Sequence, residues 1–223
     1  MNKKAIILFS GGLDSTTCLA IAKDRGYIPY SLSFEYDQKH SFEICAAEKI
    51  AKSLGSEQHK VVSLSLGVLG GSALTDEKID VPDFKNNTII PVTYVPARNA
   101  IFLSIALGWA EIVGALDIFI GINAVDYSGY PDCRPDFLNA FEKLSNLATR
   151  QMENGVKYKI HAPLLEMTKS EIILEGTRLG VDYSHTVSCY RLDSSGKACG
   201  KCDSCFYRKS GFLKAGIKDP TKY

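Results

Sequence analysis

The residues Ser10-Gly11-Gly12-Leu13-Asp14-Ser15-Thr16 stand between a short apolar run, residues 5–9, and a segment with helical periodicity, residues 17–25. This order predicts a strand, a glycine turn and a helix. The first turn of a helix has backbone N–H groups without partners and carries about half a positive charge, so it attracts anions. Glycines also let a phosphate approach the backbone closely. The loop is therefore a candidate phosphate site.

The carboxylate of Asp14 is unexpected in such a loop because it repels a phosphate. A magnesium ion between the two would remove the repulsion, since magnesium bridges carboxylate and phosphate oxygens. The chain contains neither a Walker loop nor a dinucleotide fingerprint. The residue types alone also fit an ordinary glycine turn in which Asp14 or Ser15 caps the helix.

Length and charge bound the class of protein. The chain has 223 residues, with 26 Lys and Arg against 25 Asp and Glu. This length suits one α/β domain over residues 1–223, which includes a C-terminal segment over residues 186–223. The balanced charge argues against a strongly electrostatic nucleic-acid binder. Because the apolar runs are too short for a membrane span or a signal peptide, we expect a cytoplasmic protein without nucleic-acid or membrane partners.

Apolar runs alternate with amphipathic segments along the chain. The runs at residues 5–9, 28–34, 61–66 and 116–122 predict strands buried on both faces, and residues 41–54, 98–114 and 135–151 predict helices. The alternation favours a doubly wound, mostly parallel sheet. Ligands bind beyond the carboxyl ends of such strands, so the glycine loop should meet residues 36–40 and 123–134 there. Residues 74–87 predict a loop, either a lid or plain surface.

Four cysteines, Cys189, Cys199, Cys202 and Cys205, lie in the C-terminal segment, the last three spaced Cys-x₂-Cys-x₂-Cys. Four thiolates close a tetrahedral zinc site and leave no position for water, so a structural role is expected. A reducing compartment disfavours disulfides. A [4Fe–4S] cluster is the alternative, because ferredoxins use the same spacing, although no proline follows Cys205.

The segment 123–134 is dense in hydrogen-bonding side chains and precedes a helix that should begin at Pro135. A guanine-like ring needs a carboxylate for its adjacent N–H groups and an aromatic or guanidinium plane for stacking. The segment supplies these groups through Asp126, Tyr127, Tyr130, Asp132 and Arg134. The same composition also fits a polar turn with a helix cap.

The sequence Ser-Gly-Gly-x-Asp-Ser resembles the loop of the ATP pyrophosphatase (PP-loop) superfamily. Together with Val95-Pro96-Ala97-Arg98-Asn99, the 126–134 stretch and the four cysteines, it resembles the family of 7-cyano-7-deazaguanine synthases over nearly the whole chain. One departure is Asp37, which stands where the family pattern has glycine; aspartate tolerates left-handed backbone angles better than most residues.

The resemblance implies an adenine nucleotide alpha hydrolase-like fold with a zinc-bound helical tail. It also implies that ATP is cleaved between its α and β phosphates. It implies that 7-carboxy-7-deazaguanine and ammonia become the nitrile in queuosine precursor biosynthesis, through successive adenylation of carboxylate and amide, in a homodimer. The implied cofactors are ATP, magnesium and zinc.

The implied site residues follow the motifs. Asp14, as magnesium ligand, and Arg98 and Lys169, as phosphate-binding cations, are the catalytic candidates; Lys169 follows Thr168 in a capping box. The 126–134 residues named above bind the deazaguanine, and the four cysteines bind zinc. The candidate ATP-binding residues are Leu8, Phe9, Ser10, Gly11, Gly12, Leu13, Asp14, Ser15, Thr16, Thr17 and Cys18.

Two other classes of function compete with this interpretation. A sulfur-transfer enzyme acting on tRNA also adenylates a base through such a loop, but it would need a catalytic cysteine or an iron–sulfur cluster and a basic face. A zinc module that binds nucleic acid would leave the glycine loop unexplained, and its affinity would fall steeply with salt.

Overall fold

The computed structural model describes residues 3–38, 42–85, 90–123, 129–150 and 155–223. Five parallel strands form a sheet in the order β3-β2-β1-β4-β5. This arrangement confirms the predicted parallel α/β architecture. The strands are β1 (Lys3–Leu8), β2 (Tyr27–Glu35), β3 (Gln58–Ser63), β4 (Asp117–Phe119) and β5 (Lys159–His161).

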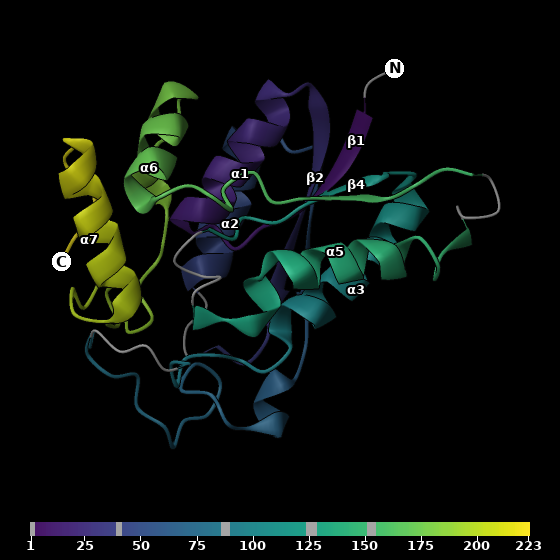
Figure 1. Cartoon of the computed structure of the whole chain (residues 1–223). Coiled ribbons are helices and arrows are strands. Elements are labelled where there is room, and N and C mark those ends of the chain that lie inside the picture. Colours follow the sequence, from purple (N-terminus) through teal and green to yellow (C-terminus); the bar gives the residue numbers. More distant parts are fainter. Residues whose placement is uncertain (1–2, 39–41, 86–89, 124–128, 151–154) are drawn as a thin grey trace.

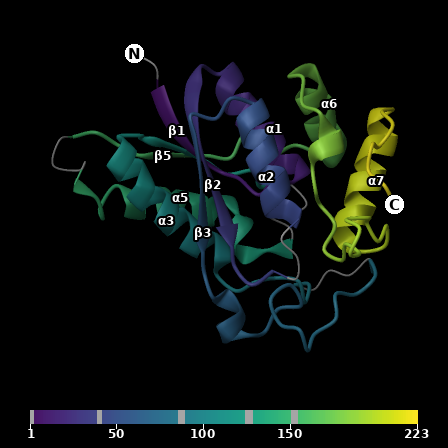
Figure 2. The same cartoon turned by 180° about the vertical axis from the view of Figure 1, so that it is seen from behind.

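Helices cover both faces of the sheet, and β1 is buried between them (Figure 1 and, from behind, Figure 2). Ala5 and Ile7 of β1 pack toward one layer, and Ile6 and Leu8 pack toward the other. The first layer holds α1 (Leu13–Asp24), α2 (Phe42–Ser53) and α6 (Lys169–Arg178), with α7 (Asp203–Ala215) beside α6. The second layer holds α3 (Arg98–Val113) and α5 (Pro135–Ser145).

The strand order creates the crevice that the sequence predicts. After β1 the chain moves outward through β2 and β3, and it then returns across β1 to build β4 and β5. The connections after β1 and β4 therefore leave in opposite directions, and a ligand crevice forms at the carboxyl ends of these two strands. The glycine loop follows β1 at this point.

Helix α1 begins earlier than the apolar pattern indicates. Gly12 is its N-cap, and no side chain caps it. Asp14 and Ser15 therefore lie in the first turn of the helix, and the interpretation of either residue as the cap is wrong. Because no side chain occupies the cap, the backbone N–H groups of this turn remain available to an anion.

Two strands differ from the predictions because their surroundings differ. The strand predicted over residues 61–66 runs from Gln58 to Ser63, and Leu66 lies in a 3₁₀ turn, η1 (Leu66–Leu69). It is an edge strand rather than one buried on both faces, and Val61 is 37% exposed. The opposite edge strand, β5, was not predicted.

The helix predicted over residues 135–151 begins at Pro135 as expected but ends at Ser145. Asn146 explains the early end. Its side-chain amide donates to the carbonyl oxygen of Tyr158 at 3.0 Å and accepts from the Tyr158 backbone N–H at 2.7 Å. The side chain thereby binds the segment that enters β5, and the chain leaves the helix there.

The predicted loop over residues 74–87 has no helix or strand in its described part, residues 74–85. It is nevertheless anchored to the rest of the fold, because Leu74 and Val81 are buried. The ring of Phe84 also stacks on that of Phe206 in α7, with 3.6 Å between the ring centres. Among the residues that the structure describes, no helix combines the length and the apolar character that crossing a membrane requires.

Candidate active site

A cavity of about 260 Å³ opens at the carboxyl ends of the strands. The glycine loop, the ends of β1, β2 and β4, the start of α3 and the C-terminal segment all contribute to its wall. The predicted ATP-binding residues that line it are Leu8, Phe9, Ser10, Gly12, Leu13, Asp14 and Ser15. Gly11, Thr16, Thr17 and Cys18 are not among its lining residues, and the last three are buried within α1.

The glycine loop is fixed from both sides. Gly11 has φ +75°, and a Cβ there would lie 2.7 Å from the Ala47 backbone nitrogen and 2.9 Å from the Glu43 carbonyl oxygen. Only glycine fits this left-handed position against α2. On the other side, the Val187 N–H donates to the Gly11 carbonyl oxygen at 3.1 Å. Ser10 and Ser15 place their hydroxyl oxygens 3.1 Å apart at the cavity.

Two of the candidate catalytic residues bind each other. The Lys169 ammonium donates to both carboxylate oxygens of Asp14, at 2.8 and 2.7 Å. The two side chains are only 15% and 26% exposed, so water screens the pair weakly. Thr168 caps α6 with the predicted capping box, which fixes Lys169 in the first helical turn. The charge of Asp14 is thus compensated by a lysine in this structure.

Arg98 begins α3 on the cavity wall, with its guanidinium carbon 5.9 Å from the ring centre of Tyr36 and 6.0 Å from that of Phe102. Ala97, immediately before it, has φ 55° and ψ 18°. This left-handed conformation costs a non-glycine residue about 1–2 kcal/mol. The strained turn directs the chain so that Arg98 reaches the cavity.

Replacing Ala97 by glycine should raise the free energy of unfolding by about 1 kcal/mol, because glycine adopts the left-handed conformation without the Cβ penalty. Urea denaturation would measure the change. Ala100→Gly is the matched control, since Ala100 lies inside right-handed α3 and should lose about 0.5–1 kcal/mol. A loss of stability in Ala97→Gly would contradict the strain.

The departure at Asp37 leaves the turn intact. Asp37 has φ 64°, and its carboxylate accepts from the Gly67 backbone N–H at 2.9 Å. The next residue, Gln38, lines the cavity, and its side-chain oxygen accepts from the Tyr36 N–H at 2.6 Å. His40 lies outside the described residues. Aspartate therefore holds the left-handed position and gains a contact that glycine could not make.

The residues proposed for a guanine-like ring are placed unevenly. Asp126 and Tyr127 lie outside the described residues. Tyr130 lines the cavity, whereas Arg134 is exposed and is not a lining residue. The carboxylate of Asp132 is buried and accepts from the Asn99 backbone N–H at 2.9 Å. In this structure Asp132 therefore braces the start of α3.

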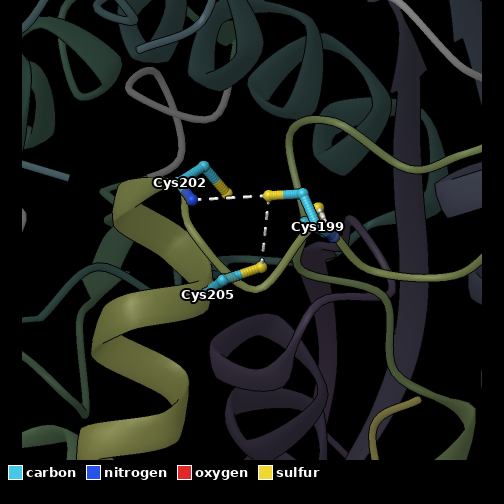
Figure 3. Close-up of side chains that lie close together, drawn as sticks. Cys199, Cys202 and Cys205 are labelled. Carbon is cyan, nitrogen blue, oxygen red and sulfur yellow. Dashed lines mark hydrogen bonds between the residues drawn. The ribbon is translucent and has the colours of Figure 1, made fainter. Parts of the chain in front are cut away.

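The four candidate metal ligands converge in the C-terminal segment. The sulfur atoms of Cys189, Cys199, Cys202 and Cys205 all lie within 4.8 Å of one another. Figure 3 shows the thiols of the last three pointing toward a common centre. The backbone N–H groups of Lys201 and Cys202 donate to the Cys199 sulfur, each at 3.4 Å. Burial disfavours the thiolate, but these donors outweigh it and hold the pKa of Cys199 below its usual value.

The family described as queuosine biosynthesis protein QueC matches residues 4–216. The chain belongs to this family. A protein of Cellvibrio japonicus (strain Ueda107) named 7-cyano-7-deazaguanine synthase is 61% identical over 221 residues, which cover 99% of this chain and 98% of that protein. One of the same name from Coxiella burnetii (strain RSA 331 / Henzerling II) is 62% identical over 221 residues, with the same shares of 99% and 98%.

Solved structures of other proteins share the fold of this QueC family member. The NMN synthetase from Francisella tularensis gives a TM-score of 0.52 at 17% identity, over 97% of this chain and 78% of that one. A predicted subunit of tRNA methyltransferase from Methanocaldococcus jannaschii also gives 0.52, at 19% identity, over 79% and 76% of the two chains. At these identities the likeness concerns the fold alone.

Sequence reasoning about this QueC family member missed part of its cavity wall. Glu43 of α2 lines the cavity, as do Ser188, Tyr190 and Ser204 of the C-terminal segment. Glu43 lies in the first turn of a helix, where an acidic residue is ordinary, so the sequence held no signal for it. The C-terminal residues follow or adjoin the cysteines, and only the fold brings that segment to the glycine loop.

Proposed function

We propose that this chain converts 7-carboxy-7-deazaguanine and ammonia to 7-cyano-7-deazaguanine at the expense of ATP. Membership of the QueC family and the name of its close relatives support the overall reaction. The structural observation that carries the proposal is the single cavity shared by the glycine loop, Arg98 and Tyr130. A nucleotide and an organic acid can meet there.

The reaction explains why a phosphate site adjoins a polar pocket. A carboxylate is a poor electrophile, and transfer of AMP to it creates a good leaving group. Ammonia then displaces AMP and forms an amide. A second adenylation, on the amide oxygen, lets AMP leave with loss of a proton and gives the nitrile. Each adenylation releases pyrophosphate, whose charge must be compensated.

The residues of the loop take the phosphates in this proposal. The uncapped first turn of α1 offers backbone N–H groups, and Ser10 and Ser15 add hydroxyl donors. Arg98 compensates charge on the AMP side of the cleaved bond. Lys169 stands beside the pyrophosphate position through its pair with Asp14. Catalysis is therefore positioning and charge compensation.

Magnesium and zinc are the metals we propose. The oxygens of Asp14 that accept from Lys169 are the atoms that would bind magnesium, which would compensate the charge of the leaving pyrophosphate. For zinc, tetrahedral thiolates stand about 3.8 Å apart, and the Cys199 and Cys205 sulfurs are 4.0 Å apart. A [4Fe–4S] cluster binds each thiolate to a different iron and spreads the sulfurs wider, so the spacing favours one ion.

The test is an analysis of products from the purified protein with ATP, magnesium, ammonium and 7-carboxy-7-deazaguanine. Mass spectrometry should find the nitrile, and the nucleotide product should be AMP. ADP as the sole nucleotide product would contradict the cleavage site. Thiolated tRNA together with brown protein would support the sulfur-transfer alternative instead. A homodimer, a cytoplasmic location and one domain over residues 1–223 remain predictions, the first of them open to sedimentation.

A further inference from the structure

Glu43 carries a carboxylate that forms no hydrogen bond or ion pair with another described residue of the cavity wall. Of the described residues that line the cavity, only Asp14 and Glu43 have carboxyl groups, and none is a histidine. Asp14 is held by Lys169. Within the described part of the chain, the Glu43 side chain makes neither a hydrogen bond nor an ion pair. Among the described lining residues, Glu43 thus carries the one carboxylate that is available to a ligand.

The backbone places Glu43 firmly beside the glycine loop. Glu43 lies in the first turn of α2, and its carbonyl oxygen is the atom that a Cβ on Gly11 would approach to 2.9 Å. The start of α2 and the phosphate loop therefore keep a fixed separation. A group held by the Glu43 carboxylate would therefore stand in the same cavity as the glycine loop, where we propose that the nucleotide binds.

Among the described residues, few charged or titratable groups lie around Glu43. Arg98 of α3 attracts its carboxylate. Burial raises the pKa of the Tyr36 phenol, after β2, and the nearby charge of Glu43 raises it further, although Arg98 lowers it. Two histidines lie on the elements that pack against α2. Burial lowers the pKa of His59 of β3, and the charge of Glu48 partly opposes this. The exposed side chain of His185 places its Nε2 atom 3.5 Å from a carboxylate oxygen of Asp182. Burial raises the pKa of Glu43 to about 7, although Arg98 lowers it.

The proposed function supplies a task for such a group. Near neutral pH most ammonia is present as ammonium, which has no lone pair and cannot attack a carbonyl carbon. A base is most effective when its pKa lies near the working pH. A carboxylate also attracts the cation that it is to deprotonate. The other acid of the cavity, Asp14, is already occupied by Lys169.

We propose that Glu43 accepts a proton from ammonium in the step that forms the amide, an inference that rests on the proposed function. An N–H bond of ammonium breaks, and its proton moves to a carboxylate oxygen of Glu43. The lone pair left on nitrogen forms the C–N bond to the acyl adenylate. The C–O bond to AMP breaks with its electron pair on AMP, and nitrogen then loses a second proton to water.

The experiment compares two nucleophiles in Glu43→Gln. With ammonium near neutral pH, amide formation should fall about 10²–10⁴-fold, the usual contribution of a general base. With hydroxylamine, which is uncharged near neutral pH, hydroxamate formation should change less than about threefold, because no ammonium must lose a proton. The ammonium defect should shrink about tenfold for each unit of rising pH, as free ammonia increases. Glu48→Gln, an exposed change on the same helix, is the matched control.

A separate assay distinguishes this inference from the proposed function. Exchange of labelled pyrophosphate into ATP, with the carboxylated substrate and no ammonia, precedes the proton transfer and should survive in Glu43→Gln. Loss of exchange with a raised KM for that substrate would mean that Glu43 holds the ring N–H groups, and it would overturn the inference. Absence of exchange in the unmodified protein would overturn the proposed function itself.

Thermal unfolding at several pH values shows whether Glu43→Gln is folded and how the charge of Glu43 affects stability. The pKa of Glu43 is higher in the folded chain, about 7, than its ordinary value of 4.5. Between these values the folded state binds more protons, so its stability falls as the pH rises through this range. Glu43→Gln lacks this loss, so its Tm should rise above that of the unmodified protein as the pH passes through this range and should stay above it at higher pH. A Tm below that of the unmodified protein at every pH would contradict an unpaired Glu43 carboxylate in the cavity wall.

Discussion

Replacing Lys169 by methionine is expected to lower kcat about 10²–10³-fold, the usual cost of removing one group that stabilises developing charge. In the structure its ammonium bonds both oxygens of Asp14. Without it, the proposed magnesium ion alone would compensate the combined negative charge of Asp14 and the departing pyrophosphate. Single-turnover measurement of AMP release would follow the effect. Lys214→Met, which removes an exposed lysine from α7, is the matched control and should leave the rate unchanged.

Variants of Asp14 show whether Lys169 acts in catalysis or only neutralises the charge of Asp14. Asp14→Ala is expected to abolish turnover while the fold is retained, because it removes the proposed magnesium ligand from the loop. If Lys169 and Asp14 served only to neutralise each other, the double variant Lys169→Met with Asp14→Asn would regain activity. We expect it to be no faster than the slower single variant. Recovery to the unmodified rate would contradict a role for Lys169 at the phosphates.

Local chemistry explains which elements were predictable from the sequence. A pair of glycines between a strand and a helix predicts a turn, and Gly11 and Gly12 form such a pair. Pro135 and the Thr168 capping box fix helix starts through contacts with their nearest neighbours, and both starts were placed correctly. The alternation of apolar and amphipathic segments was sufficient to predict the parallel sheet.

Features that depend on distant neighbours were not predictable in the same way. The apolar run at residues 61–66 indicates a buried strand, but only the strand order shows that β3 is an edge. The end of α5 depends on a contact between Asn146 and Tyr158.

The candidate site shows the same division. The sequence supplies the glycine loop and the four candidate metal ligands as local patterns. It does not show that Lys169 binds Asp14 across 155 positions, or that Asp132 braces Asn99. Glu43 was missed entirely. Its role follows from the lack of a hydrogen bond or ion pair with any other described residue, which the sequence cannot show. Motifs thus identify the chemistry, whereas the fold decides which charged groups remain available for it.

Cys202→Ser is expected to lower the free energy of unfolding by about 3 kcal/mol or more, which corresponds to a fall in Tm of about 6–12 °C for a chain of this size. The C-terminal segment before α7 is mostly loop, so a metal bound by the four cysteines would supply much of its folding energy. Cys202 is fully buried at the N-cap of α7, and a serine there replaces a thiolate by a weaker ligand for zinc. Calorimetry and metal analysis would measure the effect.

The matched control is Cys45→Ser, because Cys45 is an exposed cysteine away from the cluster and its change should leave metal content and Tm unaltered. Elemental analysis should find one zinc per chain in the unmodified protein. Iron with acid-labile sulfide would instead support the [4Fe–4S] alternative. Unchanged melting and unchanged metal content in Cys202→Ser would refute a structural metal site.

Cys202→Ser should affect kcat less than it affects the free energy of unfolding. Some effect on kcat is expected, because α7 packs against residues of the candidate active site. A Cβ at Gly211 of α7 would lie 2.6 Å from Cγ of Lys169, so the backbone of α7 packs closely against the aliphatic part of that lysine. Arg208, buried on the same helix, donates to the hydroxyls of Thr186 and Ser188 at 2.7 and 3.2 Å, and Ser188 lines the cavity. These contacts hold α7 in place when the metal is weakened. Below its lowered Tm, Cys202→Ser should therefore retain kcat within about tenfold, a loss of at most about 1.4 kcal/mol in barrier height.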